Sequence, residues 1–205
     1  LGPKFLQYAL KHTPELLDTV DFVVGNQKEK KKRVRYTEAD LNRCYGADED
    51  NYESRRAKQL LEHIDSGGYD LVIDMHTTTC VQPPCLIVGS LEHPEVKRYL
   101  KNSHIKHVLQ VHSLYDIASR VEQLVAYEVR NQDITQQLLS RIASDLSHYL
   151  SDKVSSSSKQ LFRMQDKIYK KDVSTAHAKT FKNFEMHELG FVPIMTGNNS
   201  YKRQT

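Results

Sequence analysis

The sequence predicts an α/β protein in which helices cover a β-sheet. Helical and strand patterns alternate up to about residue 150, and this order gives a layered α/β architecture. Hydrophobic residues are 39% and charged residues 27% of the 205 residues, which is enough apolar content for a packed core. Strand signals dominate the remainder. We therefore expect a main domain over residues 1–154 and a small β-rich C-terminal subdomain over residues 155–205.

The N-terminal quarter of the chain predicts a helix, a strand and a long loop. Residues 3–12 carry apolar side chains at helical spacing, and Pro14 disfavours continuation of that helix. Residues 20–24 are a β-branched and aromatic run, which is typical of a buried strand. Residues 26–51 are polar, so we expect a long loop there, and loops of this length are commonly functional or disordered.

Two helices and two strands are expected in the next fifty residues. Residues 52–65 have a helical pattern that ends at a Gly-Gly pair. Residues 69–75 form a nearly continuous apolar run, which is typical of a central strand covered on both faces. Residues 85–88 predict another strand, and residues 94–100 predict a short helix.

The rest of the chain combines short strands with one long helix. Residues 108–111 and 124–129 predict strands. Residues 134–154 carry apolar side chains along one stripe, so we expect a long amphipathic helix. Weaker strand signals follow around residues 161–168 and 191–195, and they are the basis for the β-rich subdomain.

Composition excludes several classes of protein. The net charge is only +3, from 29 basic and 26 acidic residues, so nucleic-acid binding is not suggested. The apolar runs are a few residues long, whereas a membrane-spanning helix needs about twenty apolar residues, and no signal peptide is visible. The three cysteines (Cys44, Cys80 and Cys85) are too few for a disulfide framework, so we expect a reducing compartment, the cytoplasm.

The sharpest candidate site is the segment Asp74-Met75-His76-Thr77-Thr78-Thr79. It lies at the C-terminal end of the strand predicted over residues 69–75, which is where α/β sheets place ligands. A histidine followed by small hydroxyl residues can face a cleft at that point. The alternative is a hydrogen-bonded histidine at a strand end, and an isolated motif of this kind remains a hypothesis.

A second candidate is the charged segment over residues 35–43. Arg35 and Arg43 can grip carboxylates through paired hydrogen bonds, which suits an anionic substrate. Asn42 can both donate and accept a hydrogen bond beside them. The alternative is a solvated charged loop. The basic run over residues 28–33 is better explained in that way.

A third candidate is Glu128, which lies inside an apolar strand pattern. A carboxylate in such a strand is costly unless it is paired or functional. Burial raises the pKa of such a carboxylate toward the range useful for general acid–base catalysis. The alternative is that strand alternation turns Glu128 to solvent on an edge strand. Buried carboxylates are enriched in sites but are not confined to them.

These segments, with polar loops at residues 113–120 and 197–201, resemble the aspartoacylase and succinylglutamate desuccinylase family of the zinc carboxypeptidase superfamily. The resemblance covers essentially the whole chain and keeps the family's order of motifs. Its most specific parts are Arg35-Tyr36 with Asp40-Leu41-Asn42-Arg43, and then Asp74-x-His76-x-Thr78. It implies a zinc-carboxypeptidase-like central mixed β-sheet flanked by helices, with a small β-rich C-terminal appendage.

The resemblance also implies a zinc-dependent catalytic centre. In it, His76 resembles the third zinc ligand, and Asp40 resembles the carboxylate that orients a zinc-bound histidine. Glu128 resembles the glutamate that activates the attacking water, and Arg35 resembles the arginine that polarises the scissile carbonyl and holds the oxyanion. A zinc ion with three protein ligands keeps one position open for water and lowers the pKa of that water toward about 7.

Substrate recognition is implied by four further residues. Asn42 and Arg43 resemble the pair that binds the α-carboxylate of the substrate. Arg120 resembles the arginine that reads the carboxylate on the acyl side. Tyr201 resembles a C-terminal tyrosine that closes on the substrate. Two cationic contacts of this kind would select an N-acyl amino acid that carries carboxylates.

The family's first metal motif, His-x-x-Glu, is absent from its expected place. The resemblance places it immediately before a segment like Leu1-Gly2-Pro3, so we expect two zinc ligands to lie outside the printed chain. The one His-x-x-Glu spacing in the chain, from His12 to Glu15, falls at the end of a predicted helix and is interpreted as chance.

Three hypotheses follow for the activity. The first is zinc-dependent hydrolysis of the amide bond of a small N-acyl amino acid such as N-acetyl-aspartate. The second is a catalytically inactive, truncated form that binds a carboxylate ligand or a partner protein. The third is a metallocarboxypeptidase that acts on peptides. We expect a small-molecule substrate, no nucleic-acid or membrane partner, and a possible homo-oligomer.

Overall fold

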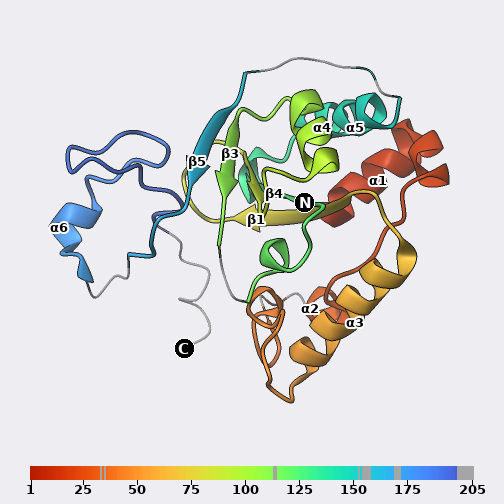
Figure 1. Ribbon diagram of the computed structural model, residues 1–205, viewed down its shortest axis with the longest axis horizontal. Helices are drawn as coiled ribbons and strands as arrows, with labels where there is room; N and C mark the ends of the chain where they lie inside the picture. Colours follow the sequence, from red (N-terminus) through yellow and green to blue (C-terminus); the bar gives the residue numbers. More distant parts are fainter. Residues whose placement is uncertain are drawn as a thin grey trace.

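The computed structural model contains a five-stranded mixed sheet with helices on both faces (Figure 1). The residues that the structure describes are 1–32, 34, 36–112, 115–151, 153, 158–168 and 172–197. The strands are β1 (Val72–Thr78), β2 (Cys85–Val88), β3 (His107–Gln110), β4 (Leu124–Arg130) and β5 (Gln160–Arg163). Their order across the sheet is β1-β4-β2-β3-β5, so β4 lies between β1 and β2.

The helices connect these strands. The α-helices are α1 (Gly2–His12), α2 (Gln27–Lys32), α3 (Tyr52–Gly67), α4 (Pro94–Asn102), α5 (Gln136–Leu150) and α6 (Thr175–Ala178). Short 3-10 helices occur at η1 (Pro14–Asp18), η2 (Leu41–Arg43), η3 (Ile117–Ser119) and η4 (Asn131–Asp133). Within the described ranges, every helix is too short or too polar to cross a membrane.

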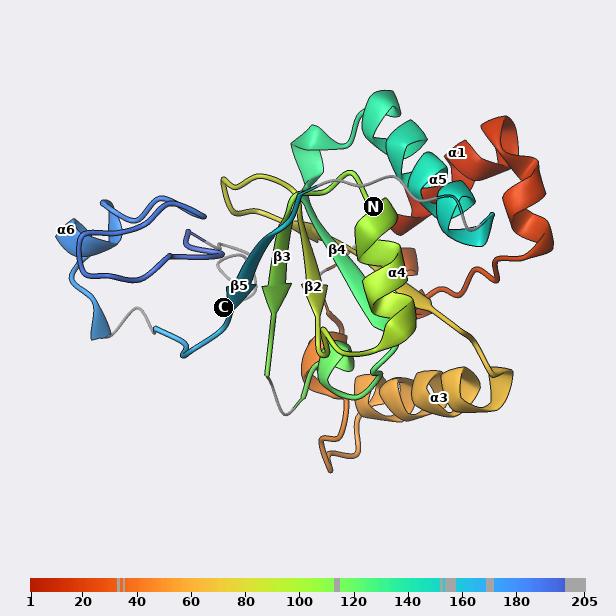
Figure 2. The same ribbon diagram turned by 45° about the horizontal axis from the view of Figure 1, so that its top comes forward.

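Strand direction decides which strand ends meet. β4 runs parallel to β1 and antiparallel to β2, whereas β3 runs parallel to both β2 and β5. The carboxyl ends of β1 and β4 therefore share one edge of the sheet, and the amino end of β2 lies beside them. Figure 2 shows β2 and β3 side by side between β4 and β5.

One face of the sheet is covered by α1, α4 and α5 (Figures 1 and 2). The core on this face includes Phe5 of α1, Tyr99 of α4, Ile142 of α5 and Tyr127 of β4, which are all fully buried. The rings of Tyr99 and Tyr127 meet edge to face, and their hydroxyl oxygens lie 2.5 Å apart. This hydrogen bond satisfies two hydroxyl groups that would be costly to bury alone.

The opposite face is covered by α3 and by η3. Ala57, Leu60 and Ile64 of α3 occur at helical spacing and pack with Leu124 and Ala126 of β4. Helix α3 begins at Asn51, whose side chain accepts a hydrogen bond from the Ser54 amide. The residues of β4 thus alternate between the two cores, and the strand is almost entirely buried.

Most predicted elements are confirmed, with ends shifted by a few residues. The confirmed helices are those predicted at residues 3–12, 52–65, 94–100 and 134–154. The confirmed strands are those predicted at residues 85–88, 108–111 and 124–129, and the signal at 161–168 corresponds to the shorter β5. The polar segment 26–51 is largely irregular and contains α2 and η2. The α/β fold with a central mixed sheet is therefore confirmed.

The strand predicted over residues 20–24 is wrong, because that backbone is irregular. Phe22 packs against the core and its ring centroid lies 6.2 Å from that of Phe5. The carbonyl groups of Val24 and Gly25 accept hydrogen bonds of 2.8 Å from the Arg56 guanidinium group of α3. A side chain distant in sequence therefore satisfies backbone groups that would otherwise form part of a strand ladder.

The strand predicted over residues 69–75 forms, but among the described strands it lies at the end of the sheet, so the prediction of a central position is wrong for this part of the chain. β1 is the first strand in the sheet order, and its residues are half-buried up to Thr77. β4 has the central position among the described strands. An apolar run indicates that a strand is buried under other elements, but it does not indicate which strands pair with it.

Residues 172–190 lie mostly beyond β5, to one side of the sheet (Figures 1 and 2). The Phe184 ring nevertheless contacts His107 of β3, with ring centroids 4.7 Å apart. Residues 191–195, predicted as a strand, have irregular backbone. The Phe191 carbonyl accepts from the His187 amide (2.8 Å), and the Pro193 carbonyl accepts from the Phe184 amide (2.9 Å), so these groups bond within a local loop. The strand prediction at 191–195 is wrong, while the division into domains at residue 154 stays a prediction.

Candidate active site

His76 and Glu128 lie side by side at one edge of the sheet. β1 and β4 pair in parallel, with His76 opposite Glu128. Residues opposite each other in neighbouring strands point to the same face of a sheet. Glu128 is half-buried, and β4 lies between two other strands. The alternative of a solvent-facing glutamate on an edge strand is therefore wrong.

The His76 ring is held by a carboxylate of its own strand. Asp74 is two residues earlier and so points to the same face. Its Oδ2 atom lies 2.5 Å from Nε2 of His76, and the two side chains are 26% and 31% exposed. His76 is thus a hydrogen-bonded histidine at a strand end. A carboxylate on one ring nitrogen is also how proteins orient a metal-binding imidazole.

The segment after Asp40 forms η2, and Asp40 caps it. Asp40 Oδ1 accepts a hydrogen bond from the Asn42 amide (3.1 Å), while Oδ1 of Asn42 accepts from the Ile117 amide of η3 (3.3 Å). The exposed Arg43 guanidinium donates to the Asn42 carbonyl (2.7 Å). The structure thus brings two segments with predicted substrate-binding residues together. The role of Asp40 in orienting a histidine stays a prediction.

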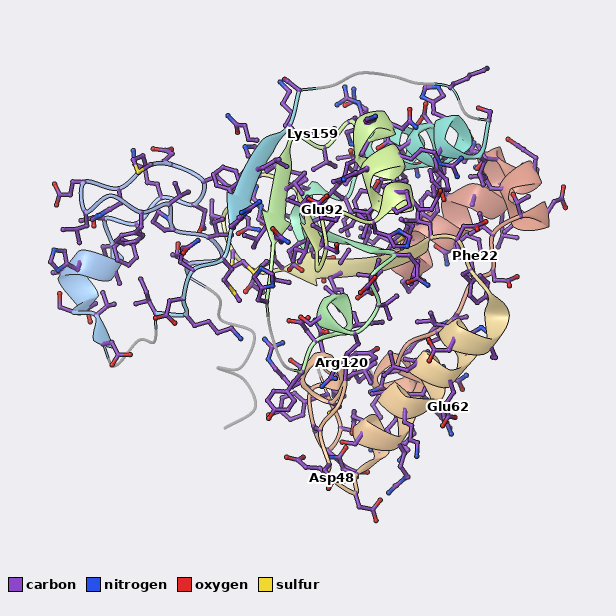
Figure 3. The ribbon with its side chains drawn as sticks, viewed as in Figure 1. Phe22, Asp48, Glu62, Glu92, Arg120 and Lys159 are labelled. Atoms are coloured by element: carbon purple, nitrogen blue, oxygen red, sulfur yellow. The ribbon has the colours of Figure 1, made fainter. Side chains whose placement is uncertain are left out.

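Arg120 follows η3 and reaches the turn after η2 (Figure 3). Its Nε donates to the Tyr45 carbonyl (3.3 Å), and the Tyr45 amide donates to the Tyr115 carbonyl (3.2 Å). Tyr45 is buried, and its burial, followed by the negative charge of Asp74, raises the pKa of Tyr45. The contacts of Tyr45 therefore join the Arg120 side chain to the backbone of Tyr115.

Glu53 of α3 fixes the loop that precedes η2. Its side chain is fully buried. The donors to its carboxylate are the side chains of Asn26 and Thr37 and the amides of Thr37, Glu38 and Ala39. Burial alone would raise the pKa of Glu53, but these hydrogen bonds together hold it below its ordinary value. The Glu53 carboxylate therefore fixes the conformation of the segment before Asp40.

Two buried cysteines lie near Glu128. Cys85 of β2 is opposite Glu128 in the antiparallel ladder. Burial raises the pKa of the Cys80 and Cys85 thiols, and the charge of Glu128 acts in the same direction. Both thiols are fully buried. Burial and the raised pKa favour the protonated thiols, which pack as small hydrophobic groups.

The residues present do not hold a zinc ion by themselves. Within the described part of the chain, no three side chains of the His, Cys, Asp and Glu types gather as a metal-binding group. His76, with Asp74 behind it, has the chemistry of one zinc ligand. A catalytic zinc site needs three protein ligands, so the donor set found here is incomplete.

Two predicted site residues lie outside the described residues. These are Arg35, predicted to hold the oxyanion, and Tyr201, predicted to close on the substrate. Their roles stay predictions. The same holds for the roles of Asn42, Arg43 and Arg120 toward a substrate, although the structure places these three residues on connected segments.

Three residues of the site were not assigned a role by sequence reasoning. Asp74 stands two residues before His76, and the period of two in a strand could have indicated its contact. Glu53 lies in the first turn of α3, where an acidic residue is ordinarily explained by the helix dipole. Gly46 has a positive φ of 89° beside Arg120. Local sequence gives no signal for the last two contacts, because their partners are distant along the chain.

Comparison with curated proteins identifies relatives of one kind. A probable aspartoacylase of Nostoc sp. is 32% identical over 99 residues, which are 42% of this chain and 34% of that protein. A probable aspartoacylase of Acaryochloris marina is 36% identical over 84 residues, which are 37% of this chain and 28% of that protein. The matched regions therefore span about a third or less of the length of these relatives.

Solved structures share the fold. Murine aminoacylase 3 superposes with a TM-score of 0.54 at 20% identity, covering 74% of this chain and 59% of that one. The succinylglutamate desuccinylase of Chromobacterium violaceum gives a TM-score of 0.56 at 19% identity, covering 80% and 60%. A sequence model of the succinylglutamate desuccinylase/aspartoacylase catalytic domain matches residues 4–132, well over half of the chain. The chain belongs to the succinylglutamate desuccinylase and aspartoacylase family.

Proposed function

We propose that this chain carries much of the active site of a zinc-dependent amidohydrolase that cleaves small N-acyl amino acids such as N-acetyl-aspartate. The observation that carries the proposal is the pairing of His76 with Glu128 on neighbouring strands. It sets a candidate general base beside a histidine that is already oriented by Asp74. Membership of a family whose named members are desuccinylases and aspartoacylases supports the same reaction class.

Glu128 is proposed as the proton carrier. It would take a proton from the water that attacks the amide carbonyl and then deliver a proton to the leaving amine. Its half-buried position at the end of β4 supports this role, because partial burial keeps bulk water from competing for the proton. Arg35 is proposed to stabilise the oxyanion that forms on the carbonyl oxygen.

Arg43, Asn42 and Arg120 are proposed to recognise the carboxylates of the substrate. Guanidinium groups bind carboxylates through paired, charge-assisted hydrogen bonds. The contacts that join η2 to η3 and to Arg120 support a common binding surface for these side chains. The acetyl group of N-acetyl-aspartate has no carboxylate, so with this substrate Arg120 is proposed to bind the carboxylate of the aspartate side chain instead of one on the acyl side. Two such cations suit a small dianionic substrate better than a long peptide. Tyr201 is proposed to cover the bound substrate.

Zinc enters the proposal through the family and through His76. The two further ligands are proposed to precede Leu1 in the complete protein. Gly2 at the start of α1 lies against β1, because a Cβ atom placed on Gly2 would be 3.7 Å from Cβ of Met75. The start of α1 therefore lies beside the strand that carries His76.

A cytoplasmic location is also part of the proposal. All three cysteines are buried and free, which is consistent with a reducing compartment. We further propose a small-molecule substrate as the principal partner, and homo-oligomerisation stays open to measurement by analytical ultracentrifugation.

The function is tested by turnover of N-acetyl-aspartate by the complete protein. We expect equimolar release of aspartate and acetate, one zinc ion per chain, and loss of turnover after chelation that added zinc restores. A short acetylated peptide serves as the competing substrate. Faster cleavage of the peptide would favour a carboxypeptidase instead. Saturable binding of N-acetyl-aspartate without turnover or zinc would favour an inactive carboxylate-binding protein.

A further inference from the structure

The turn after η2 has a conformation that favours glycine at one position. The turn runs from Cys44 to Ala47 and is closed by a hydrogen bond from the Ala47 amide to the Cys44 carbonyl (3.2 Å). Gly46 occupies its third position with φ of 89°. A positive φ at the third position is the mark of a type II turn, in which glycine is strongly favoured.

The Arg120 side chain lies directly against this turn (Figure 3). Its Nε donates to the carbonyl of Tyr45, one residue before Gly46 (3.3 Å). A Cβ atom placed on Gly46 would lie 2.6 Å from Cζ and 2.9 Å from Nε of Arg120. Both distances are too short for atoms that are not bonded to each other. The guanidinium group therefore occupies the space that any other residue at position 46 would fill.

The surrounding contacts make the turn a fixed platform. The Tyr45 amide donates to the Tyr115 carbonyl, and the Tyr45 side chain is buried. The neighbouring η2 is tied to η3 by the Asn42–Ile117 hydrogen bond. The turn cannot readily retreat from Arg120, because its backbone is held from both sides. A side chain at position 46 would instead displace the guanidinium group of Arg120, which is the end of a long side chain.

We infer that Gly46 is a positioning residue that holds the Arg120 guanidinium where it reads the second carboxylate of the substrate, and so sets the preference for dianionic substrates. The inference rests on the proposed function, which supplies the role of Arg120. The inference adds how this chain orients the Arg120 guanidinium: Gly46 leaves space for it, and the Tyr45 carbonyl accepts its hydrogen bond.

The test compares two ligands that differ by one charge. N-acetyl-aspartate and N-acetyl-asparagine have the same shape, but only the former has a second carboxylate, on its side chain. All affinities are measured by calorimetry in a Glu128→Gln background, so that the ligand is not hydrolysed during the titration. With Gly46 in place, we expect N-acetyl-aspartate to bind about ten- to a hundredfold more tightly, the range for a charge-assisted hydrogen bond. In Gly46→Ala we expect this preference to be lost, with the affinity for N-acetyl-asparagine unchanged.

Gly190→Ala is the matched control. Gly190 has a similar φ of 81°, but a Cβ there meets nothing within 4 Å, so the variant carries the same backbone strain without a displaced neighbour. We expect it to keep the preference for N-acetyl-aspartate. In an Arg120→Ala background, Gly46→Ala should have no further effect on that preference. The Nε–H signal of Arg120 in ¹⁵N NMR should shift in Gly46→Ala and stay in place in Gly190→Ala.

The outcomes separate the inference from the proposed function. An unchanged Arg120 Nε–H signal in Gly46→Ala would overturn the inference whatever the ligands do. An equal loss of affinity for both ligands would also overturn it, as would a further loss in the Arg120→Ala background. Failure of the protein with Gly46 in place to bind either ligand, with the Nε–H signal shifted in Gly46→Ala, would instead contradict the proposed function and with it the reading of a second carboxylate.

Discussion

At the scale of single residues, the site depends on a few buried polar groups whose partners are distant in sequence. Glu53 receives hydrogen bonds from residues 14 to 27 positions earlier, and Asn42 reaches η3 across 75 positions. Each contact removes a polar group from water and replaces its hydration with a directed hydrogen bond. Side chains of this kind fix loop geometry more narrowly than apolar packing can.

Replacing Glu53 by Gln should lower the free energy of unfolding by about 2 kcal/mol at pH 7, because several donors lose a charged acceptor. The pKa of Glu53 is lowered in the folded protein. Its contribution is therefore fully present above the unfolded pKa of about 4.3 and is lost as pH falls through the lower, folded pKa. Urea unfolding between pH 7 and pH 3 measures both effects.

The control for Glu53 is Glu62→Gln on the same helix. Glu62 is exposed on α3 (Figure 3), so its replacement should change the free energy of unfolding by no more than about 0.5 kcal/mol. As the pH falls from 7 to 3, the free energy of unfolding should decrease more for the wild type than for Glu53→Gln. If it decreased equally for these two proteins, the Glu53 carboxylate would not stabilise the fold in the way described.

At the scale of elements, α1, α4 and α5 are each held to the sheet by one or two fully buried side chains. Helix α1 contributes Phe5 and Ala9, both without solvent exposure. Phe5 packs in the core shared with α4 and α5, while Leu10 on the same helix is 57% exposed. The apolar spacing of α1 thus predicted the helix, and the buried face determines where it docks.

Phe5→Ala should lower the free energy of unfolding by about 3–5 kcal/mol, because it removes a large buried side chain and leaves a cavity. Leu10→Ala, on the same helix, should cost no more than about 0.5 kcal/mol because the site is exposed. Denaturant unfolding at fixed pH compares the two. Equal losses would mean that α1 does not dock through the face seen here.

At the scale of the whole molecule, sequence patterns predicted where helices and strands form better than they predicted which of them lie side by side. Residues 69–75 have the apolar run of a central strand, yet β1 is the first strand of the sheet. Residues 20–24 have strand propensity, but the Arg56 guanidinium donates to the carbonyl group of Val24 and to that of Gly25 directly after the run. In both cases the decisive partner lies far along the chain, so no local pattern could record it.

The residues of the candidate site likewise fall into those that the sequence could predict and those that it could not. His76 and Glu128 could be proposed from their places at strand ends and from a family resemblance, and the parallel register places them side by side. Glu53 and Gly46 could not be given their roles, because these depend on which side chain lies opposite them in space, whereas the period of two in a strand could have indicated the contact of Asp74 with His76. The sheet register and the loop contacts supply that information, and they follow from tertiary packing.

The central claim is that Glu128 performs the proton transfer in amide hydrolysis. The most direct measurement is the turnover rate of N-acetyl-aspartate by zinc-loaded Glu128→Gln, compared with Glu122→Gln, which changes an exposed glutamate near the start of the same strand. The account predicts a fall of about 100- to 10,000-fold for Glu128→Gln, with substrate affinity retained, and no change for Glu122→Gln. An unaltered rate in Glu128→Gln would contradict the account.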